Sequence, residues 1–226
     1  MERRSLSVIL LAGGSGTRFG CGQNKVFLLL EGQPVLQHSL RVFLEHPAVD
    51  EVILVYRSGD EAEIRAVLSA SPSDKPVRII TGGDTRQGSV RRGLALVRGE
   101  RVMIHDGARP RISRSDIDAL LAVMPAVPGA ALAVPSPDTV KITDDAGLVL
   151  QTTDRAHTWL IQTPQCFETQ TLRCLHERFR DRRDMTDDCM LLEAAGLPVR
   201  LVRGREENRK LTRPYDLALL SSRLPG

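Results

Sequence analysis

Short runs of β-branched and aliphatic residues alternate with helical patterns through the first 135 residues of this 226-residue chain. We expect strands at residues 7–12, 51–56, 77–81, 101–105 and 130–134. We expect helices at residues 34–45, 60–70, 89–97 and 113–123. Because strands that are apolar along their whole length are buried on both faces, the alternation predicts an α/β fold in which helices sandwich a mostly parallel sheet.

The pattern changes after residue 135. Ser136 and Pro137 interrupt the alternation, and residues 139–143 and 148–152 are typical of two strands joined by a turn. The later elements that we expect are a strand at 159–161, helices at 169–178 and 186–195, a strand at 199–202 and a helix from residue 214. Since we find no convincing boundary, we predict one domain over residues 1–226, from which residues 136–158 protrude as a β-hairpin arm.

Glycines crowd the end of the first expected strand. The sequence LAGGSGTRFG at residues 11–20 follows an apolar run, and Lys25 comes soon after. Glycine lets backbone N–H groups approach a ligand closely, while Arg18 and Lys25 add positive charge. The spacing G-x-G-x-x-x-G differs from the dinucleotide fingerprint, and Gly20 lacks the Lys-Ser/Thr pair of a P-loop. A structural turn would need neither cation. The segment therefore predicts a loop that binds a nucleotide phosphate and is neither a dinucleotide-binding motif nor a P-loop.

Two more polar segments follow the third and fourth expected strands, so three such segments converge on the sheet edge where ligands bind. Asp106 could cap a turn, or it could hold Mg²⁺ beside phosphates while Arg109 contacts an anionic substrate. Residues 81–89 could form a turn whose Ser89 caps the next helix, or Asp84 and Ser89 could bind a base or ribose. We expect His105 to be a hydrogen-bonded strand residue rather than a base.

Composition narrows the range of partners and locations. The net charge is +3 and aromatic residues make up 4% of the chain, which argues against the stacking surfaces of single-stranded nucleic-acid binders. The cysteines lack C-x-x-C spacing, so we expect reduced thiols in a cytoplasmic protein rather than a zinc site. The N-terminal apolar run is too short for a signal peptide, and no segment reaches the ~20 apolar residues of a membrane-spanning helix. We therefore predict no nucleic-acid or membrane partner.

None of the usual catalytic sets can be assembled from the sequence. We find no Ser/His/Asp or Cys/His arrangement, no acid–base carboxylate pair and no metal cage. This omission fits a reaction whose nucleophile is already ionised, such as a phosphate oxygen. Such a transfer needs mainly positioning and electrostatic stabilisation by backbone N–H groups, Arg, Lys and Mg²⁺.

Seven blocks of sequence occur in order between residue 8 and about residue 220. They are LAGGSGTRFG with Lys25, TGGDTRQGSV, HDGARP, DTVK at 138–141, TDR at 153–155, QTPQ at 162–165 and NRKLTRPYDL. Together they resemble the 2-C-methyl-D-erythritol 4-phosphate cytidylyltransferase family. The resemblance implies a Rossmann-like fold and transfer of the cytidylyl group of CTP to methylerythritol phosphate, with release of pyrophosphate, in isoprenoid precursor biosynthesis. The alternative is a cytidylyltransferase for ribitol 5-phosphate or another polyol phosphate.

The resemblance also implies the site residues. The catalytic charges would be Arg18, Lys25, Arg155 and Lys210. The nucleotide would contact Ala12, Gly13, Gly14, Gly16, Gly83, Asp84, Ser89, Asp106 and Gly107. The acceptor substrate would contact Arg109, Thr139, Arg155, Thr163 and Lys210. Asp106 would hold the Mg²⁺ cofactor, and the arm would carry Arg155 to a partner's site in a homodimer. One departure is Asn24, which stands where the family often has proline.

Overall fold

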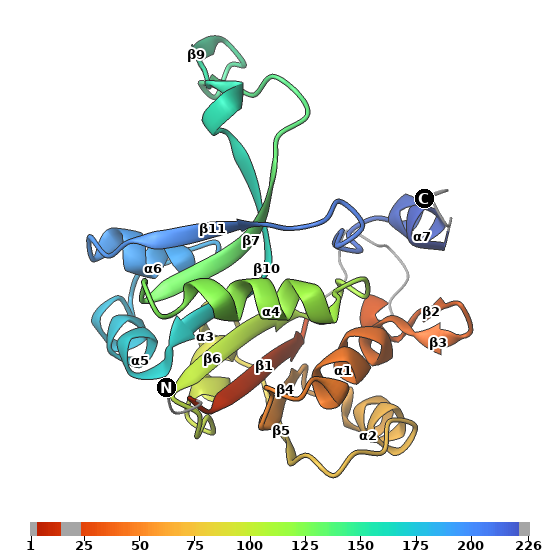
Figure 1. The fold of residues 1–226 in the computed structure, drawn as a ribbon. Coiled ribbons are helices and arrows are strands. Elements are labelled where there is room, and N and C mark those ends of the chain that lie inside the picture. The colour runs from red at the N-terminus through yellow and green to blue at the C-terminus, as the bar shows by residue number, and fades with distance from the viewer. Residues whose placement is uncertain (1–3, 15–23, 222–226) are drawn as a thin grey trace.

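A computed structural model describes residues 4–14 and 24–221, and its centre is a seven-stranded sheet with the order β11-β7-β10-β6-β1-β4-β5 (Figure 1). The strands are β1 (Leu6–Ala12), β4 (Glu51–Tyr56), β5 (Val77–Thr81), β6 (Arg101–Asp106), β7 (Gly129–Pro135), β10 (Trp159–Glu168) and β11 (Val199–Arg203). Neighbouring strands are parallel except where β10 pairs with β6 and β7. The predicted α/β fold with a mostly parallel sheet is confirmed.

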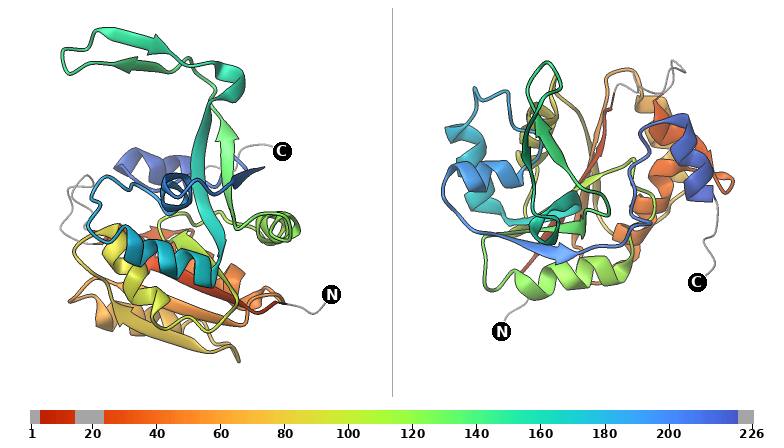
Figure 2. Two further views of the ribbon diagram at one scale, coloured as in Figure 1. Left: turned by 90° about the vertical axis from the view of Figure 1, so that its left-hand side faces the viewer. Right: turned by 90° about the horizontal axis from the view of Figure 1, so that it is seen from above.

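Helices cover both faces of the sheet (Figure 2). They are α1 (Val35–Glu45), α2 (Glu61–Ser69), α3 (Arg86–Leu94), α4 (Arg114–Val123), α5 (Thr169–Arg178), α6 (Cys189–Ala194) and α7 (Pro214–Ser221). Successive side chains of β1 point to opposite faces. Val8 and Leu10 therefore pack with α1, α2 and α4, whereas Ile9 packs with α3, α5 and α6. This two-sided burial explains why β1 is apolar along nearly its whole length.

Helix α3 corrects one of the two sequence interpretations of residues 81–89. The helix begins at Arg86, and its N-cap is Thr85, whose hydroxyl accepts a hydrogen bond from the Gly88 N–H at 2.9 Å. Ser89 lies inside the first turn and does not cap the helix, so that prediction was wrong. Two other boundaries also differ from expectation, because α6 begins only at Cys189 and β10 runs for ten residues rather than three.

A small antiparallel sheet lies apart from the main one. Strands β8 (Lys141–Thr143) and β9 (Val149–Thr152) form it, and the 3₁₀ turn η3 (Arg155–His157) follows. Figures 1 and 2 show this part projecting away from the body beyond β7 and β10. The hydrogen-bonded turn between β8 and β9 ends at Gly147, which has the left-handed φ of 84° that glycine tolerates. We call residues 136–158 the arm, and its role in dimerisation stays a prediction.

Three shorter elements lie between β1 and α1. The 3₁₀ turn η2 (Lys25–Phe27) is followed by the two-residue strands β2 (Leu29–Leu30) and β3 (Gln33–Pro34), which pair with each other. Val26 and Phe27 are buried in the core on the α1 face, so the turn is anchored by packing. Within the described ranges, no helix is long and apolar enough to cross a membrane.

Candidate active site

A pocket of about 420 Å³ lies at the carboxyl ends of β1, β5 and β6. Strand β1 is hydrogen-bonded to β4 on one side and to β6 on the other, so the order in which strands are added to the sheet reverses beside β1. Ligands of open α/β sheets commonly bind at such a point. The residues that line the pocket are Leu11, Gly13, Gly14, Lys25, Val26, Gly83, Asp84, Thr85, Arg86, Ser89, Asp106, Ala108, Lys210 and Thr212. The three polar segments thus meet at one edge, as predicted.

The turn between β5 and α3 forms one wall of this pocket. The Ser89 hydroxyl accepts a hydrogen bond from the Gly83 N–H at 3.1 Å and lies 3.3 Å from the Gly83 carbonyl oxygen. A Cβ on Gly83 would lie 3.1 Å from the Gly88 carbonyl carbon, so the turn packs too closely for a larger residue. Ser89 therefore holds Gly83 against the helix and leaves the Asp84 side chain beside the pocket.

Asp106 is the electrostatic centre of the site. One of its carboxylate oxygens lies 2.8 Å from Lys210 Nζ and 3.7 Å from Arg109 Nε, and the other lies 3.9 Å from Arg86 Nε. Burial by itself would raise the pKa of Asp106, but the charges of Lys210, Arg86 and Arg109 overcome it and hold the pKa far below its usual range. Asp106 is thus a carboxylate at any physiological pH.

Arg86 is a pocket residue that sequence reasoning missed. Its Nη1 donates to Asp188 at 2.6 Å, and Asp188 also bonds His176 Nε2 at 3.1 Å, with both acidic and imidazole side chains buried. The second amino group, Nη2, is buried without a protein partner. Burial opposes the charge of Arg86, but Asp188 and Asp106 outweigh it and raise the guanidinium pKa. Because Asp188 lies 102 residues from Arg86, no local pattern could reveal this pair.

His105 and Thr163 fix the backbone around Asp106. His105 Nε2 lies 3.1 Å from the Arg109 carbonyl oxygen, and Nδ1 lies 3.1 Å from the Thr163 hydroxyl, which accepts from the Asp106 N–H at 3.0 Å. Burial lowers the pKa of His105 to about 4, so the imidazole is neutral. Since a carbonyl only accepts, Nε2 carries the proton and Nδ1 accepts from Thr163. The prediction of a hydrogen-bonded strand histidine is confirmed.

The segment 208–212 delivers Lys210 to the site. Asn208 is fully buried, and its amide donates to the Thr163 carbonyl oxygen at 2.8 Å. Arg109 Nη1 donates to the Asn208 carbonyl oxygen at 2.8 Å, and the Leu211 N–H donates to the Ala108 carbonyl oxygen at 2.8 Å. These bonds tie the segment to the end of β6. The charged sequence around Lys210 is therefore anchored rather than a solvated surface run.

The predicted site residues divide into four groups. The pocket is lined by Gly13, Gly14, Lys25, Gly83, Asp84, Ser89, Asp106 and Lys210. Four more residues adjoin the pocket. Ala12 and Gly107 are sequence neighbours of Gly13 and Asp106, while Arg109 and Thr163 contact Asp106 directly. Thr139 and Arg155 are exposed in the arm, and their own chain does not place them at the pocket. Gly16 and Arg18 lie outside the described residues.

The chemistry available here is recognition of an anion rather than acid–base catalysis. Lys25, Arg86 and Lys210 face a volume that holds two carboxylates, Asp84 and Asp106, and the neighbouring imidazole of His105 is neutral and fully bonded. In the described part of the chain, no three His, Cys, Asp or Glu side chains gather closely enough to hold a metal ion.

The sequence and structure comparisons all match proteins of one enzyme family. The family model for 2-C-methyl-D-erythritol 4-phosphate cytidylyltransferase matches residues 6–224. The enzyme of that name from Microcystis aeruginosa is 41% identical over 96% of this chain and 99% of its own length, and the one from Desulforamulus reducens is 37% identical over 95% and 94%. The crystal structure of 4-diphosphocytidyl-2C-methyl-D-erythritol synthase from Anaerococcus prevotii superposes with a TM-score of 0.87, at 30% identity, over 96% of this chain and 95% of that one.

Proposed function

Because the chain belongs to the 2-C-methyl-D-erythritol 4-phosphate cytidylyltransferase family, we propose that it transfers the cytidylyl group of CTP to 2-C-methyl-D-erythritol 4-phosphate. Pyrophosphate is the second product, and the pathway is isoprenoid precursor biosynthesis. One observation carries the proposal: Lys25, Lys210 and Asp106 come from distant parts of the chain and meet in one pocket beside the Gly83 turn. The named relatives do not favour the ribitol phosphate alternative.

The proposed reaction is an in-line displacement at the α-phosphorus of CTP. An oxygen of the acceptor's 4-phosphate forms the new bond, while the bond from the α-phosphorus to the bridging oxygen breaks and pyrophosphate leaves with its electron pair. The nucleophile is already an anion, so the reaction needs no general base. A neutral, fully bonded His105 is consistent with that requirement.

The pocket residues, together with Arg18 outside the described part of the chain, take the following proposed roles. Lys25 and Arg18 balance the charge that grows on the phosphoryl oxygens in the transition state. Gly83 and Asp84 bind the cytosine and ribose, held in place by Ser89. Lys210, whose ammonium group pairs with Asp106, positions the acceptor phosphate. In this proposal some of the cations bind the phosphates of CTP and Lys210 binds the phosphate of the acceptor. Such an arrangement is suited to joining two phosphate groups.

Asp106 is the residue that would hold Mg²⁺. It is ionised, lies in the pocket and is one of two carboxylates there, which fits an ion that binds one or two carboxylates together with substrate phosphates. When bound, the ion would neutralise phosphate charge on CTP.

The acceptor half of the site is proposed to come partly from a second copy of the chain. Arg155 and Thr139 are exposed in the arm, where Ile142, Leu148 and Leu150 also expose between 47% and 68% of their surface. Apolar side chains gathered on a two-stranded sheet favour contact with another surface. A homodimer in the cytoplasm, in which each arm serves the partner's pocket, remains a prediction that the hybrid experiment in the Discussion tests.

The experiment is a pyrophosphate-release assay with CTP, Mg²⁺ and a panel of polyol phosphates. We expect turnover with 2-C-methyl-D-erythritol 4-phosphate and at least about tenfold lower kcat/KM with ribitol 5-phosphate, because ribitol phosphate lacks the methyl branch and has one more carbon in its main chain, and a difference of one carbon group in a fitted site typically costs about 10- to 200-fold. ATP, GTP and UTP serve as controls for the cytosine contacts. Turnover with ribitol phosphate alone would contradict the proposed acceptor, and equal use of all nucleotides would contradict the proposed role of the Gly83 turn.

A further inference from the structure

Asn24 is a buried polar residue that directly precedes Lys25. It exposes 1% of its surface and is the N-cap of η2, the turn that Lys25 begins. No role in binding or catalysis has been given to it above, and it does not line the pocket. Its side chain nevertheless uses every polar atom, since the amide nitrogen donates twice and the amide oxygen accepts once.

These three hydrogen bonds join three separate elements. Asn24 Nδ2 donates to the carbonyl oxygen of Ala12, the last residue of β1, at 2.7 Å, and to Asp60 Oδ2 at 2.8 Å. Asn24 Oδ1 lies 3.4 Å from the N–H of Val26, within η2. The side chain thus links the end of the central strand, the start of α2 and the turn that carries Lys25.

The Asp60 anchor is itself held in place. Asp60 exposes 6% of its surface, its backbone N–H donates to the Arg57 carbonyl oxygen at 3.0 Å, and its second carboxylate oxygen accepts from Arg57 Nη2 at 2.8 Å. Asp60 follows β4, the parallel neighbour of β1. Asn24 therefore bonds to a fixed point on the sheet edge rather than to a mobile surface group.

We propose that Asn24 is a positioning residue, which fixes the backbone of Lys25 relative to the end of β1 so that the lysine reaches the reacting phosphate. The inference rests on the proposed function, in which Lys25 acts at the α-phosphate of CTP. The ammonium group of lysine lies at the end of a flexible four-carbon chain. Its position therefore depends on how well the backbone of Lys25 is fixed. On the opposite side, the buried Val26 and Phe27 fix the turn by packing, and Asn24 completes the support.

The size of the effect follows from geometry. A misplacement of about 1 Å at a reacting centre can cost on the order of 10²-fold in rate. Asn24→Ala removes all three bonds and leaves the Ala12 carbonyl and the Asp60 carboxylate without the amide. We expect it to lower kcat by about 10- to 100-fold and to change KM for CTP by less than about threefold, because a positional error acts mainly in the transition state.

A double-mutant cycle separates this role from a purely structural one. We measure kcat and KM for the wild type, Asn24→Ala, Lys25→Ala and the double variant, with CTP, Mg²⁺ and methylerythritol phosphate. If Asn24 acts through Lys25, then Asn24→Ala costs less than about twofold once Lys25 is alanine. If the two losses multiply, the positioning role is wrong. A wild type that releases no pyrophosphate would instead overturn the proposed function, and this inference with it.

Two further variants guard against loss of folding. Asp60→Ala removes one anchor and leaves the bonds to Ala12 and Val26, so we expect a smaller fall in kcat with the same dependence on Lys25. Gln37→Ala is the matched control, since Gln37 is also buried and its amide donates to the Ala70 carbonyl oxygen at 3.0 Å, between α1 and the end of α2. Gln37→Ala should lower the melting temperature, because it removes a buried hydrogen bond, yet keep the wild-type kcat. An equal fall in kcat for Gln37→Ala would overturn the inference.

Discussion

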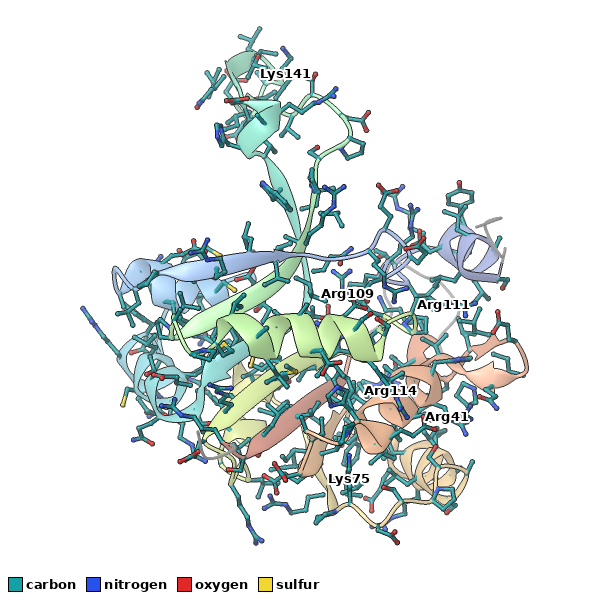
Figure 3. All side chains as sticks on the ribbon, in the orientation of Figure 1. Arg41, Lys75, Arg109, Arg111, Arg114 and Lys141 are labelled. Carbon is teal, nitrogen blue, oxygen red and sulfur yellow. The ribbon has the colours of Figure 1, made fainter. Side chains whose placement is uncertain are left out.

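The pocket and the arm use polar and apolar groups in opposite ways. In the pocket, Asp106 lies within 4 Å of three cationic side chains, and its backbone is fixed by Thr163. In the arm, residues 141–152 are all exposed, although several are large and apolar. Figure 3 shows the contrast, with Arg109 inside the body and Lys141 far out on the arm. The cluster of charges around Asp106 is assembled within a single chain, whereas the apolar side chains of the arm lie exposed to solvent.

This difference suggests which part of the molecule needs a second subunit. A two-stranded sheet is marginal in water unless something packs against it, and an exposed arginine without a fixed partner is solvated. The arm therefore makes sense if its apolar side chains and Arg155 meet another subunit. The predictions below test the two regions separately, beginning with the largest effect.

Lys25→Ala should produce the largest loss, because it removes the pocket cation proposed to act at the reacting phosphate. We expect kcat to fall by on the order of 10²- to 10³-fold, with an unchanged melting temperature. Steady-state pyrophosphate release and thermal unfolding measure the two quantities. Arg65→Ala, which removes a surface cation paired with Glu61, is the control and should keep full activity. Turnover within threefold of the wild type would exclude the proposed role of Lys25.

Arg155→Ala should weaken use of the acceptor rather than of CTP. A hydrogen bond to a charged group contributes about 1.5–3 kcal/mol, so kcat/KM for methylerythritol phosphate should fall by about 10- to 100-fold, while KM for CTP stays within about twofold. Initial rates with each substrate varied in turn separate the two. His157→Ala lies in the same exposed turn and should have little effect. If KM for CTP rose instead, Arg155 would belong to the nucleotide half of the site.

His105 should make stability depend on pH. Burial lowers its pKa from the ordinary 6.5 to about 4 in the folded chain, so between these values the unfolded chain binds the proton and the folded chain does not. Stability is therefore full above pH 6.5 and falls as the pH drops toward 4, by about 3 kcal/mol for this group alone. Chemical denaturation at pH 7.5 and 4.5 measures the change, and His105→Gln should reduce it. An identical pH dependence in the variant would contradict the buried neutral imidazole.

Leu150→Asp should have the smallest effect on folding and a clear effect on assembly. The side chain exposes 67% of its surface, so the free energy of unfolding of one chain should change by less than about 0.5 kcal/mol. A carboxylate in an apolar interface should shift the mass measured by light scattering from dimer to monomer. A variant that stays dimeric would show that the arm is not the contact between subunits.

The sequence predicted the parts of the molecule that depend on local patterns. Apolar runs located β1 and β4 because two-sided burial requires them, and the edge where Gly13, Asp84 and Asp106 meet followed from parallel strands. The hairpin strands β8 and β9 were expected within one or two residues of their ends.

Other features depend on contacts between distant residues and could not be predicted. Arg86 has its position because Asp188 and Asp106 pair with it across the fold. Asn208 lies in a segment of charged residues, yet its side chain is buried against Thr163. Ser89 was one candidate for the cap of α3, but Thr85 caps the helix and the Ser89 hydroxyl bonds to Gly83 instead.

Mixing two impaired variants tests the division between pocket and arm most directly. Lys25→Ala lacks a pocket residue and Arg155→Ala lacks an arm residue, so a mixed dimer has one site with neither defect if each arm serves its partner. After equal amounts are unfolded and refolded together, half of the dimers are mixed and half of their sites are intact, which predicts about a quarter of the wild-type activity. Activity that stays at the average of the two separate variants, at every mixing ratio, would contradict a site shared between two chains.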